Sequence, residues 1–339
     1  MQKFIPIWFL NINSPKNNFM RKLFFVFYIL TGFSAMAQVD TSTNNLLNEL
    51  EGKTVAPKSK PPVKVFMAQR LINANTVEML QKGHFEFKVV HNFGDAGGSA
   101  GGIRAAFGLD NSADIKIAFL YGITKKLNVI VSRNKGAGQV FTLWEMGFKY
   151  KFLEQREHDP SHPISLAVFA NGVSSSQLGS TDSTRENYYR KTSDRQSQTL
   201  QLMVARKFGK ILSLQLNPTY VHTNYVVKND VNHMFAFGAA IRVPIYKSFV
   251  FIADYFHPFR PKYSTDSLAS KGINFYDALG VGLELVTPGH IFHVNFTNST
   301  NILENRFIPR TTTSWRKGQY RWGFTVTRDF VLWRKKNKK

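Results

Sequence analysis

Residues 139–152, QVFTLWEMGFKYKF, alternate large apolar side chains with small or charged ones. In an extended chain Met146 and Phe148 share one face, while Glu145 and Lys149 lie on the other. A repeat of two residues predicts a β-strand, because successive side chains point to opposite sides of a sheet. One face of this strand is therefore apolar and rich in aromatic residues, and the opposite face is polar.

The same alternation recurs from residue 84 to residue 331. Most segments have about nine to fourteen residues, enough for a tilted strand to cross a bilayer. A soluble sandwich also alternates, but so many aromatic faces would require an unusually large shared core. We predict twelve strands, at 84–92, 115–122, 127–132, 139–152, 164–173, 196–207, 211–224, 233–243, 249–256, 273–286, 291–299 and 319–331.

The connections between these strands mostly alternate in length; the exceptions are the long Glu154–Pro163 and the short links 135–138 and 225–232. Transmembrane barrels show this asymmetry, with tight periplasmic turns, long external loops and an even strand number. In hydrocarbon no strand edge can stay unpaired, so such a sheet must close on itself. The predicted fold class is all-β: a transmembrane antiparallel up-and-down β-barrel of about 12 strands, with a short periplasmic N-terminal segment. The short joints are 124–126, 208–210, 244–248 and 287–290, and the long ones 93–112, 174–195, 257–272 and 300–318.

Composition excludes several other classes of protein. The chain of 339 residues contains no cysteine, which rules out a disulfide scaffold, a thiolate zinc site and attached haem. Lys and Arg number 44 against 22 Asp and Glu, a formal charge of +22, but no nucleic-acid-binding motif is recognisable. No apolar run reaches the roughly 18 residues of a membrane-spanning helix. Outer-membrane lipid is therefore the expected acidic partner, and nucleic acid is not.

The amino terminus has the features of an export signal. A basic group, Met20-Arg21-Lys22, precedes the apolar run LFFVFYILTGF (23–33), and Ala35-Met36-Ala37 gives a small-residue cleavage pattern. A buried core helix is the alternative, but the three features occur in the order of a signal peptide. The expected location is the cell outer membrane of a diderm bacterium. We predict a signal peptide over 1–37 with its true start at Met1 or Met20, a periplasmic leader and linker over 38–62, and the barrel over 63–339.

Residues 63–82 do not follow the strand pattern. The stretch VKVFMAQ (63–69) is compatible with an additional strand, a plug inside the barrel or a segment beneath it. A plug would change the function from an open pore to a gated transporter. The sequence leaves these three arrangements open.

Four blocks resemble a known family in their order and spacing. They are GHFEFKVVHNFG (83–94), FGLDNSA (107–113), YGITKKLNV (121–129) and MGFKYKFLEQ (146–155). From about residue 63 to its end, the chain resembles the uncharacterised outer-membrane β-barrels of diderm bacteria grouped as domain of unknown function family 5777. The resemblance implies a barrel, an export signal and no established activity, so no site residue is carried over. It differs at the carboxyl end, where basic residues follow Phe330 and Trp333, whereas signals for the barrel-assembly machinery usually end on an aromatic residue.

If the aromatic faces contact lipid, the polar faces point into the lumen. Charges of both signs favour a hydrated, ion-paired interior over a strongly anion-selective pore, and a packed lumen that serves only stability is the alternative. We predict a narrow porin-like channel for small polar solutes. The alternative is a structural or docking barrel that binds a periplasmic or surface protein partner through its external loops or basic tail. The lumen-lining candidates are Glu86, Lys88, Lys116, Glu145, Lys149, Arg242, Asp254, Glu284, His293 and Arg321.

No catalytic site, metal site or cofactor is predicted, and the chain is not expected to be an enzyme. His158, Asp159 and His162 have metal-binding side chains, but they lie in a proline-punctuated turn, where a solvated loop is the simpler interpretation. A lipid hydrolase of the outer membrane would need adjacent Ser and His side chains, for which His91 and Ser132 are the nearest candidates. No third orienting group is identifiable, so this function remains an unfavoured alternative.

Overall fold

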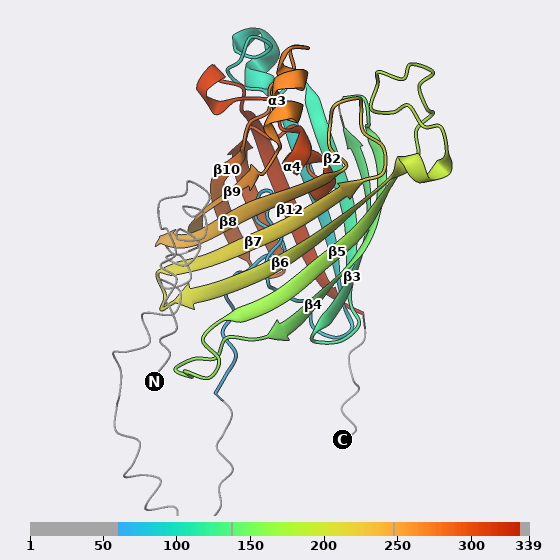
Figure 1. Ribbon diagram of the computed structural model, residues 1–339. Coiled ribbons are helices and arrows are strands. Elements are labelled where there is room, and N and C mark those ends of the chain that lie inside the picture. The colour runs from blue at the N-terminus through green and yellow to red at the C-terminus, as the bar shows by residue number, and fades with distance from the viewer. Residues whose placement is uncertain (1–59, 137, 247, 333–339) are drawn as a thin grey trace, which may run out of the picture. The chain divides into compact units, whose positions relative to one another are not determined.

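The computed structural model describes residues 60–136, 138–246 and 248–332. From residue 61 onward the chain forms a closed antiparallel barrel of twelve strands, in which β1 pairs with both β2 and β12 (Figure 1). The predicted fold class and strand number are confirmed. The strands are β1 (His84–Asp95), β2 (Ser112–Gly122), β3 (Leu127–Gly136), β4 (Thr142–Leu153), β5 (Ser165–Ser175), β6 (Gln196–Phe208), β7 (Leu212–Thr223), β8 (His233–Tyr246), β9 (Phe249–Pro258), β10 (Ala278–Thr287), β11 (His290–Thr297) and β12 (Arg321–Val331).

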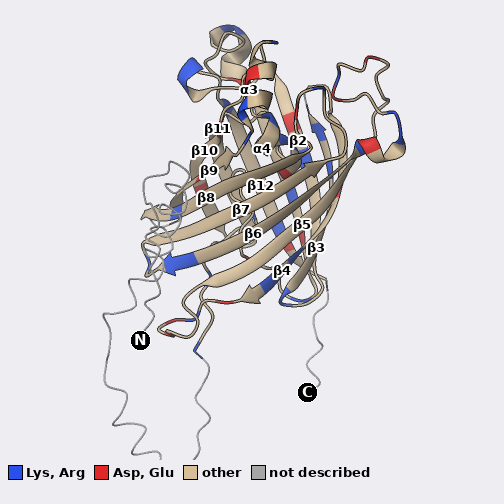
Figure 2. Cartoon of the chain, viewed as in Figure 1, with Lys and Arg blue, Asp and Glu red and all other residues tan. Residues whose placement is uncertain are grey.

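The strands turn apolar faces outward, and their inward faces carry buried charged and polar side chains, mixed with apolar ones on β5, β8 and β9. In β4, Glu145 and Lys149 are 1% and 5% exposed, whereas the outward Met146 is 70% exposed. Lys149 pairs with Asn128 of β3 and Phe169 of β5, which are also buried inside. A shift by one residue would turn these charged groups toward lipid, so the alternation fixes the register. Figure 2 shows that the outward faces of the strands in view are mostly uncharged.

The barrel has two different ends, which we call the turn end and the loop end. At the turn end, residues 123–126, 209–211 and 288–289 connect strands tightly, and only 154–164 is longer. At the loop end most connections are long, with residues 137–141 between β3 and β4 the short one, and Figure 1 shows α3 and α4 at this end, opposite the carboxyl end of β12. The helices of these connections are η2 (Ile103–Gly108), η3 (Thr192–Arg195), α3 (Lys262–Ala269), α4 (Glu304–Arg310) and η4 (Trp315–Lys317).

The tenth strand begins later than predicted, at Ala278 instead of residue 273. The amide of Tyr276 donates to the carbonyl of Thr311 at 2.8 Å, in the connection between β11 and β12. The backbone before β10 is therefore held by a neighbouring loop and not by a strand. Alternation along the sequence does not reveal such a distant partner.

The apolar core lies inside the barrel, around residues 61–82, which we call the inner segment. Val65, Phe66, Leu71 and Val77 are at most 1% exposed, and they form one cluster with small and apolar inward residues of the wall. A barrel of about eight strands is just wide enough for its own side chains, so twelve strands leave room for this segment. The inner segment therefore occupies much of the interior that we expected to be hydrated.

No helix among the described residues is long and apolar enough to cross a membrane. The predicted signal peptide (1–37), nearly all of the predicted leader (38–62) and the basic tail from Trp333 onward lie outside the described residues.

Candidate functional site

The inner segment starts at the turn end, beside the long β4–β5 turn. The amide of Val63 donates to the carbonyl of Gln155 at 2.8 Å, and the amide of Glu157 donates to the carbonyl of Pro61 at 3.2 Å. The two stretches also form an isolated antiparallel bridge. This long turn supplies a short pairing edge for the inner segment.

Further along, the inner segment folds back in a tight turn. The amide of Leu71 donates to the carbonyl of Ala74 at 2.9 Å. The carboxylate of Asp254, on β9, accepts hydrogen bonds from the successive amides of Ile72, Asn73 and Ala74 at 3.1, 2.7 and 2.9 Å. A buried carboxylate is costly unless it is hydrogen-bonded, so these amides satisfy the wall residue while the wall residue fixes the turn.

Two more inward side chains of the wall bond to the main chain of the inner segment. Gln215, on β7, accepts from the amide of Val77 at 3.0 Å and donates to the carbonyl of Asn75 at 2.6 Å. Lys149 Nζ, on β4, donates to the carbonyl of Thr76 at 3.0 Å. Like the bonds of Asp254 to the turn amides, these bonds are made to peptide groups and not to side chains.

The β11–β12 connection meets the inner segment from the loop end. Its helix α4 turns inward, and its fully buried Phe307 packs edge-on against Phe256 with ring centroids 5.1 Å apart. Arg70 Nη1 of the inner segment lies 2.6 Å from Glu304 Oε1 of α4, with side-chain exposures of 2% and 0%. Two segments that enter from opposite ends therefore touch inside the barrel.

Charged residues from three other connections surround α4 at the loop end. Glu186, between β5 and β6, lies 2.8 Å from Arg306 and 3.3 Å from Arg310. Asp230, between β7 and β8, pairs with Arg310 at 2.6 Å and with Arg260, which follows β9. Burial alone would raise the pKa of Glu186, but Arg306 and Arg310 outweigh it and lower this pKa to about 2. Ion pairs thus tie four loops together.

All ten predicted lumen-lining residues are buried, with exposures from 0% to 8%. Lys149 and Asp254 differ from the rest, because neither forms an ion pair within the described residues and each is bonded to the inner segment. Whether these ten residues line a conducting path stays a prediction. Among the other eight, Lys88 lies 3.0 Å from Glu86, Lys116 2.7 Å from Glu145, Arg242 2.7 Å and His293 3.2 Å from Glu284, and Arg321 2.5 Å from Asp95.

Sequence reasoning did not find Arg70 or Glu304, because neither lies in an alternating strand. A signal for α4 was present, however. Ile302, Leu303 and Phe307 are large apolar residues in a connection expected to be polar and external, and all three are buried. An apolar cluster in a long loop favours an inward fold over a solvated one.

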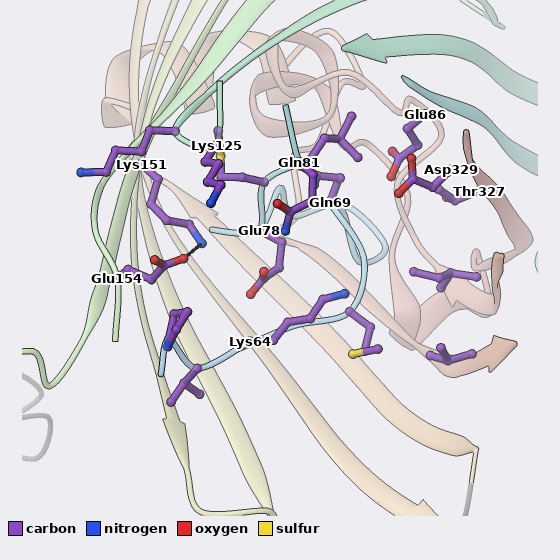
Figure 3. A pocket seen from close by; sticks show the side chains of 18 of the residues that line it. Lys64, Gln69, Glu78, Gln81, Glu86, Lys125, Lys151, Glu154, Thr327 and Asp329 are labelled. Atoms are coloured by element: carbon purple, nitrogen blue, oxygen red, sulfur yellow. Dashed lines mark hydrogen bonds and ion pairs between the residues drawn. The ribbon is translucent and has the colours of Figure 1, made fainter. Parts of the chain in front are cut away.

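A cavity of about 690 Å³ opens at the turn end, between the inner segment and the wall. Lys64 and Glu78 of the inner segment and the wall residues Glu86, Lys151 and Asp329 are among its lining residues (Figure 3). Charges of both signs surround this space, so it has no single-sign ring of the kind that produces strong ion selectivity.

The two residues considered for hydrolysis do not meet. Ser132 is buried inside the barrel and donates to Glu145 Oε2 at 2.6 Å, whereas His91 faces outward and stacks on Phe324. His91 Nε2 lies instead 3.1 Å from the hydroxyl of Ser112. Its Nδ1 has no hydrogen-bond partner within the described residues, so the third group of a catalytic triad is missing there.

The turn with metal-binding side chains is held by its own contacts. His162 Nδ1 lies 3.0 Å from Asp159 Oδ2, while His158 is largely exposed and lies 3.8 Å from Glu157. In the part of the chain that the structure describes, no group of three or more His, Cys, Asp or Glu residues is arranged to hold a metal ion.

The closed wall with an apolar exterior defines a membrane β-barrel. The chain belongs to the family described as membrane bound beta barrel domain (DUF5777), which matches residues 66–330, and the resemblance noted in the sequence is confirmed. No curated protein sequence matches the chain.

Several solved barrels have a similar fold. The KdgM porin is 9% identical, with a TM-score of 0.43 over 73% of this chain and 99% of that one. An outer-membrane channel from Pseudomonas putida F1 is 11% identical, with a TM-score of 0.41 over 77% and 100%. The outer-membrane phospholipase A of Escherichia coli is 12% identical, with a TM-score of 0.40 over 85% and 98%. These similarities concern the fold alone.

Proposed function

We propose that this chain is an outer-membrane channel whose lumen is closed by its own inner segment, and that it admits small polar solutes when the segment moves aside. One observation carries the proposal: the inner segment fills the lumen without belonging to the wall. β1 pairs directly with β12, so the ring of strands is complete without residues 61–82. A filler that contributes no strand can leave without breaking the sheet.

The polar wall supports the same proposal. Lys116 on β2 and Glu145 on β4 form an ion pair across the intervening strand β3. Their charges therefore stay compensated when the inner segment leaves. Such a wall retains its structure in both states. The twelve-strand ring is narrower than the 16–18 strands of large aqueous porins, so the open path would admit only small solutes.

The orientation follows from the connections. Tight turns face the periplasm in barrels of bacterial outer membranes, and long loops face outward. The turn end is then periplasmic, and the inner segment enters from the periplasm, as expected for the amino-terminal part of an exported chain.

Conductance in planar bilayers tests the proposal. A variant that lacks residues 61–82 should carry a steady current, whereas the full chain should be closed most of the time. A heat-shifted gel mobility establishes that each protein is folded, and Lys262→Ala, on the exposed helix α3, is the matched control. A folded deletion variant with no more current than the full chain would overturn the proposal.

A second candidate is a structural or docking barrel, which the ion-paired loop end favours. Four connections held together by buried charges form a fixed surface, and such a surface suits recognition of a partner. A silent but folded deletion variant is the result that would favour this function.

A further inference from the structure

We infer that the inward wall surface that holds the inner segment is a peptide-binding site, and that short peptides with free termini are among the solutes of this channel. We call this surface, which includes Lys149, Gln215 and Asp254, the seat. This inference rests on the proposed function. It starts from the way in which the wall holds the inner segment, which is mostly through peptide groups, with added bonds to the side chains of Asn73 and Asn75.

The polar contacts of the wall are mainly with peptide groups. Asp254 accepts from three successive amides, and Gln215 both accepts from an amide and donates to a carbonyl two residues away. The Ser213 hydroxyl donates to the carbonyl of Val65 at 2.6 Å. Every peptide offers amides and carbonyls at this spacing, so bonds of this kind do not depend on the side chains of the bound chain.

The apolar part of the seat also suits a peptide. Large apolar side chains of the inner segment, such as Phe66 and Leu71, pack against small inward residues of the wall. The inward residues of the wall in this cluster are both small and large, all of them apolar, so the seat offers apolar surface to the side chains of a bound chain. The small wall residues in this cluster are Ala118, Ala167, Ala205, Ala236, Ala240 and Ala278.

Two charged wall residues then define the ends of the ligand. Asp254 lies on β9 and Lys149 on β4, with four strands between them one way around the ring (β5 to β8) and six the other way (β10 to β3). They therefore lie on strands from opposite sides of the ring. When the inner segment leaves, the carboxylate loses its amide donors and the ammonium loses its carbonyl acceptor, and water or a ligand with complementary groups must replace them.

A short peptide with free termini restores both partners. Its terminal ammonium is a donor for Asp254, and its terminal carboxylate is an acceptor for Lys149, while its amide groups can bond to Gln215. A neutral oligosaccharide offers hydroxyl groups but no charge for either residue. An inorganic anion can compensate Lys149 alone.

Calorimetric titration of the refolded variant that lacks residues 61–82 tests this inference. The probes are tetra-alanine with free termini, tetra-alanine capped at both ends, and maltotetraose. Free tetra-alanine should bind, and the capped form should bind at least about tenfold more weakly because it lacks charge-assisted hydrogen bonds. Maltotetraose should show no binding at the same concentration.

A substitution in the seat separates the terminal charge from the rest of the peptide. In the same variant, Asp254→Asn should weaken free tetra-alanine about tenfold and should change binding of the capped form little, because the amide still accepts hydrogen bonds but carries no charge. Lys262→Ala should affect neither probe. Equal binding of free and capped peptide, equal binding of maltotetraose, or no peptide binding to a folded barrel would overturn the inference.

The readout separates this inference from the proposed function. A deletion variant that conducts but binds no peptide contradicts the peptide seat alone, and one that binds peptide without conducting contradicts the channel alone. If the deletion variant does not fold, the full chain with Arg70→Ala is used, because this change removes the contact with Glu304 and loosens the inner segment. Tetra-alanine should bind this variant more tightly than the unaltered chain, and equal binding would count against the seat.

Discussion

The two segments that fill the lumen are held in different ways. The inner segment bonds to the wall mainly through its own main chain and runs directly into β1, while its start is attached to the β4–β5 turn by hydrogen bonds only. The β11–β12 connection is covalently joined to two strands and is held by the side chains of α4, among them Arg306 and Arg310. The first segment can leave the barrel as a unit, whereas the second can only swing on its two attachments. Displacement of the inner segment is therefore the larger of the two motions available to the closed state.

The largest expected effect comes from the contact between the two segments. Glu304→Gln leaves the buried guanidinium of Arg70 without a counter-charge, and removing one partner of a buried ion pair costs about 3–5 kcal/mol. Because this contact exists only when both segments are in place, the cost falls on the closed state. Single-channel recording should show a large increase in open time.

The matched control for this prediction replaces both partners. Arg70→Met combined with Glu304→Leu removes the pair and leaves no buried charge, so much of the closure should return. Equal open times in the single variant and in the unaltered chain would show that the two segments are not coupled.

The next effect concerns the wall contact of the inner segment alone. Asp254→Asn keeps the shape of the side chain but removes its charge, and hydrogen bonds to charged groups contribute about 1.5–3 kcal/mol each, more than neutral ones. The inner segment should leave its seat more often. Trypsin cleavage after Arg70 measures this, since Arg70 is fully buried in the closed state.

The wall should remain folded in this variant, which heat-shifted gel mobility checks. Cleavage at the rate of the unaltered chain would mean that Asp254 does not hold the segment. In the loop-end contacts no change is expected, because Asp254 does not touch Glu186 or Asp230.

A smaller effect is expected at the loop end when the pH falls. The pKa of Glu186 is lowered to about 2, well below the ordinary value of about 4.3. Its ion pairs therefore stabilise the closed loops fully above the ordinary pKa, and this contribution is lost as the pH falls through about 2. Hydrogen exchange of the loop amides should be insensitive to Glu186 protonation between pH 7 and pH 5 and should increase in strong acid.

Glu186→Gln provides the comparison for this pH dependence. The variant should show faster loop exchange at neutral pH, because Arg306 and Arg310 lose a carboxylate partner. A loop transition centred at the ordinary carboxyl pKa in the unaltered chain would contradict the assignment.

The smallest effect is expected for an exposed pair at the same end. Lys262 and Asp266 lie 2.6 Å apart on α3 with side-chain exposures of 86% and 60%. Exposed ion pairs contribute little because water competes for both charges. Lys262→Ala should change neither the open time nor thermal unfolding measurably, and a clear change in open time would place α3 in the closing contacts.

The alternation of polar and apolar residues predicted the wall well, because each strand has an apolar lipid face, although the inward faces of β5, β8 and β9 carry apolar as well as polar residues. Trp144, Met146 and Phe148 point outward as expected, and Glu145 and Lys149 point inward. The period is local, so a single sequence contains it.

The filling of the barrel could not be predicted in the same way. The apolar residues of VFMAQRLINANTV (65–77) are irregularly spaced, and the segment is held by side chains far away in sequence, such as Asp254 and Gln215. Nothing near Asp254 in the sequence distinguishes a residue facing water from one capped by three amides. The same holds for Arg70 and Glu304, which are separated by 234 positions.

The start of the inner segment at the β4–β5 turn and its end at β1 have a topological consequence. Both lie at the turn end, so the inner segment enters the ring and returns on the same side. Such a loop can enter after β1 has paired with β12 and closed the ring. It can also leave and return repeatedly without breaking strand pairs and without forming a knot.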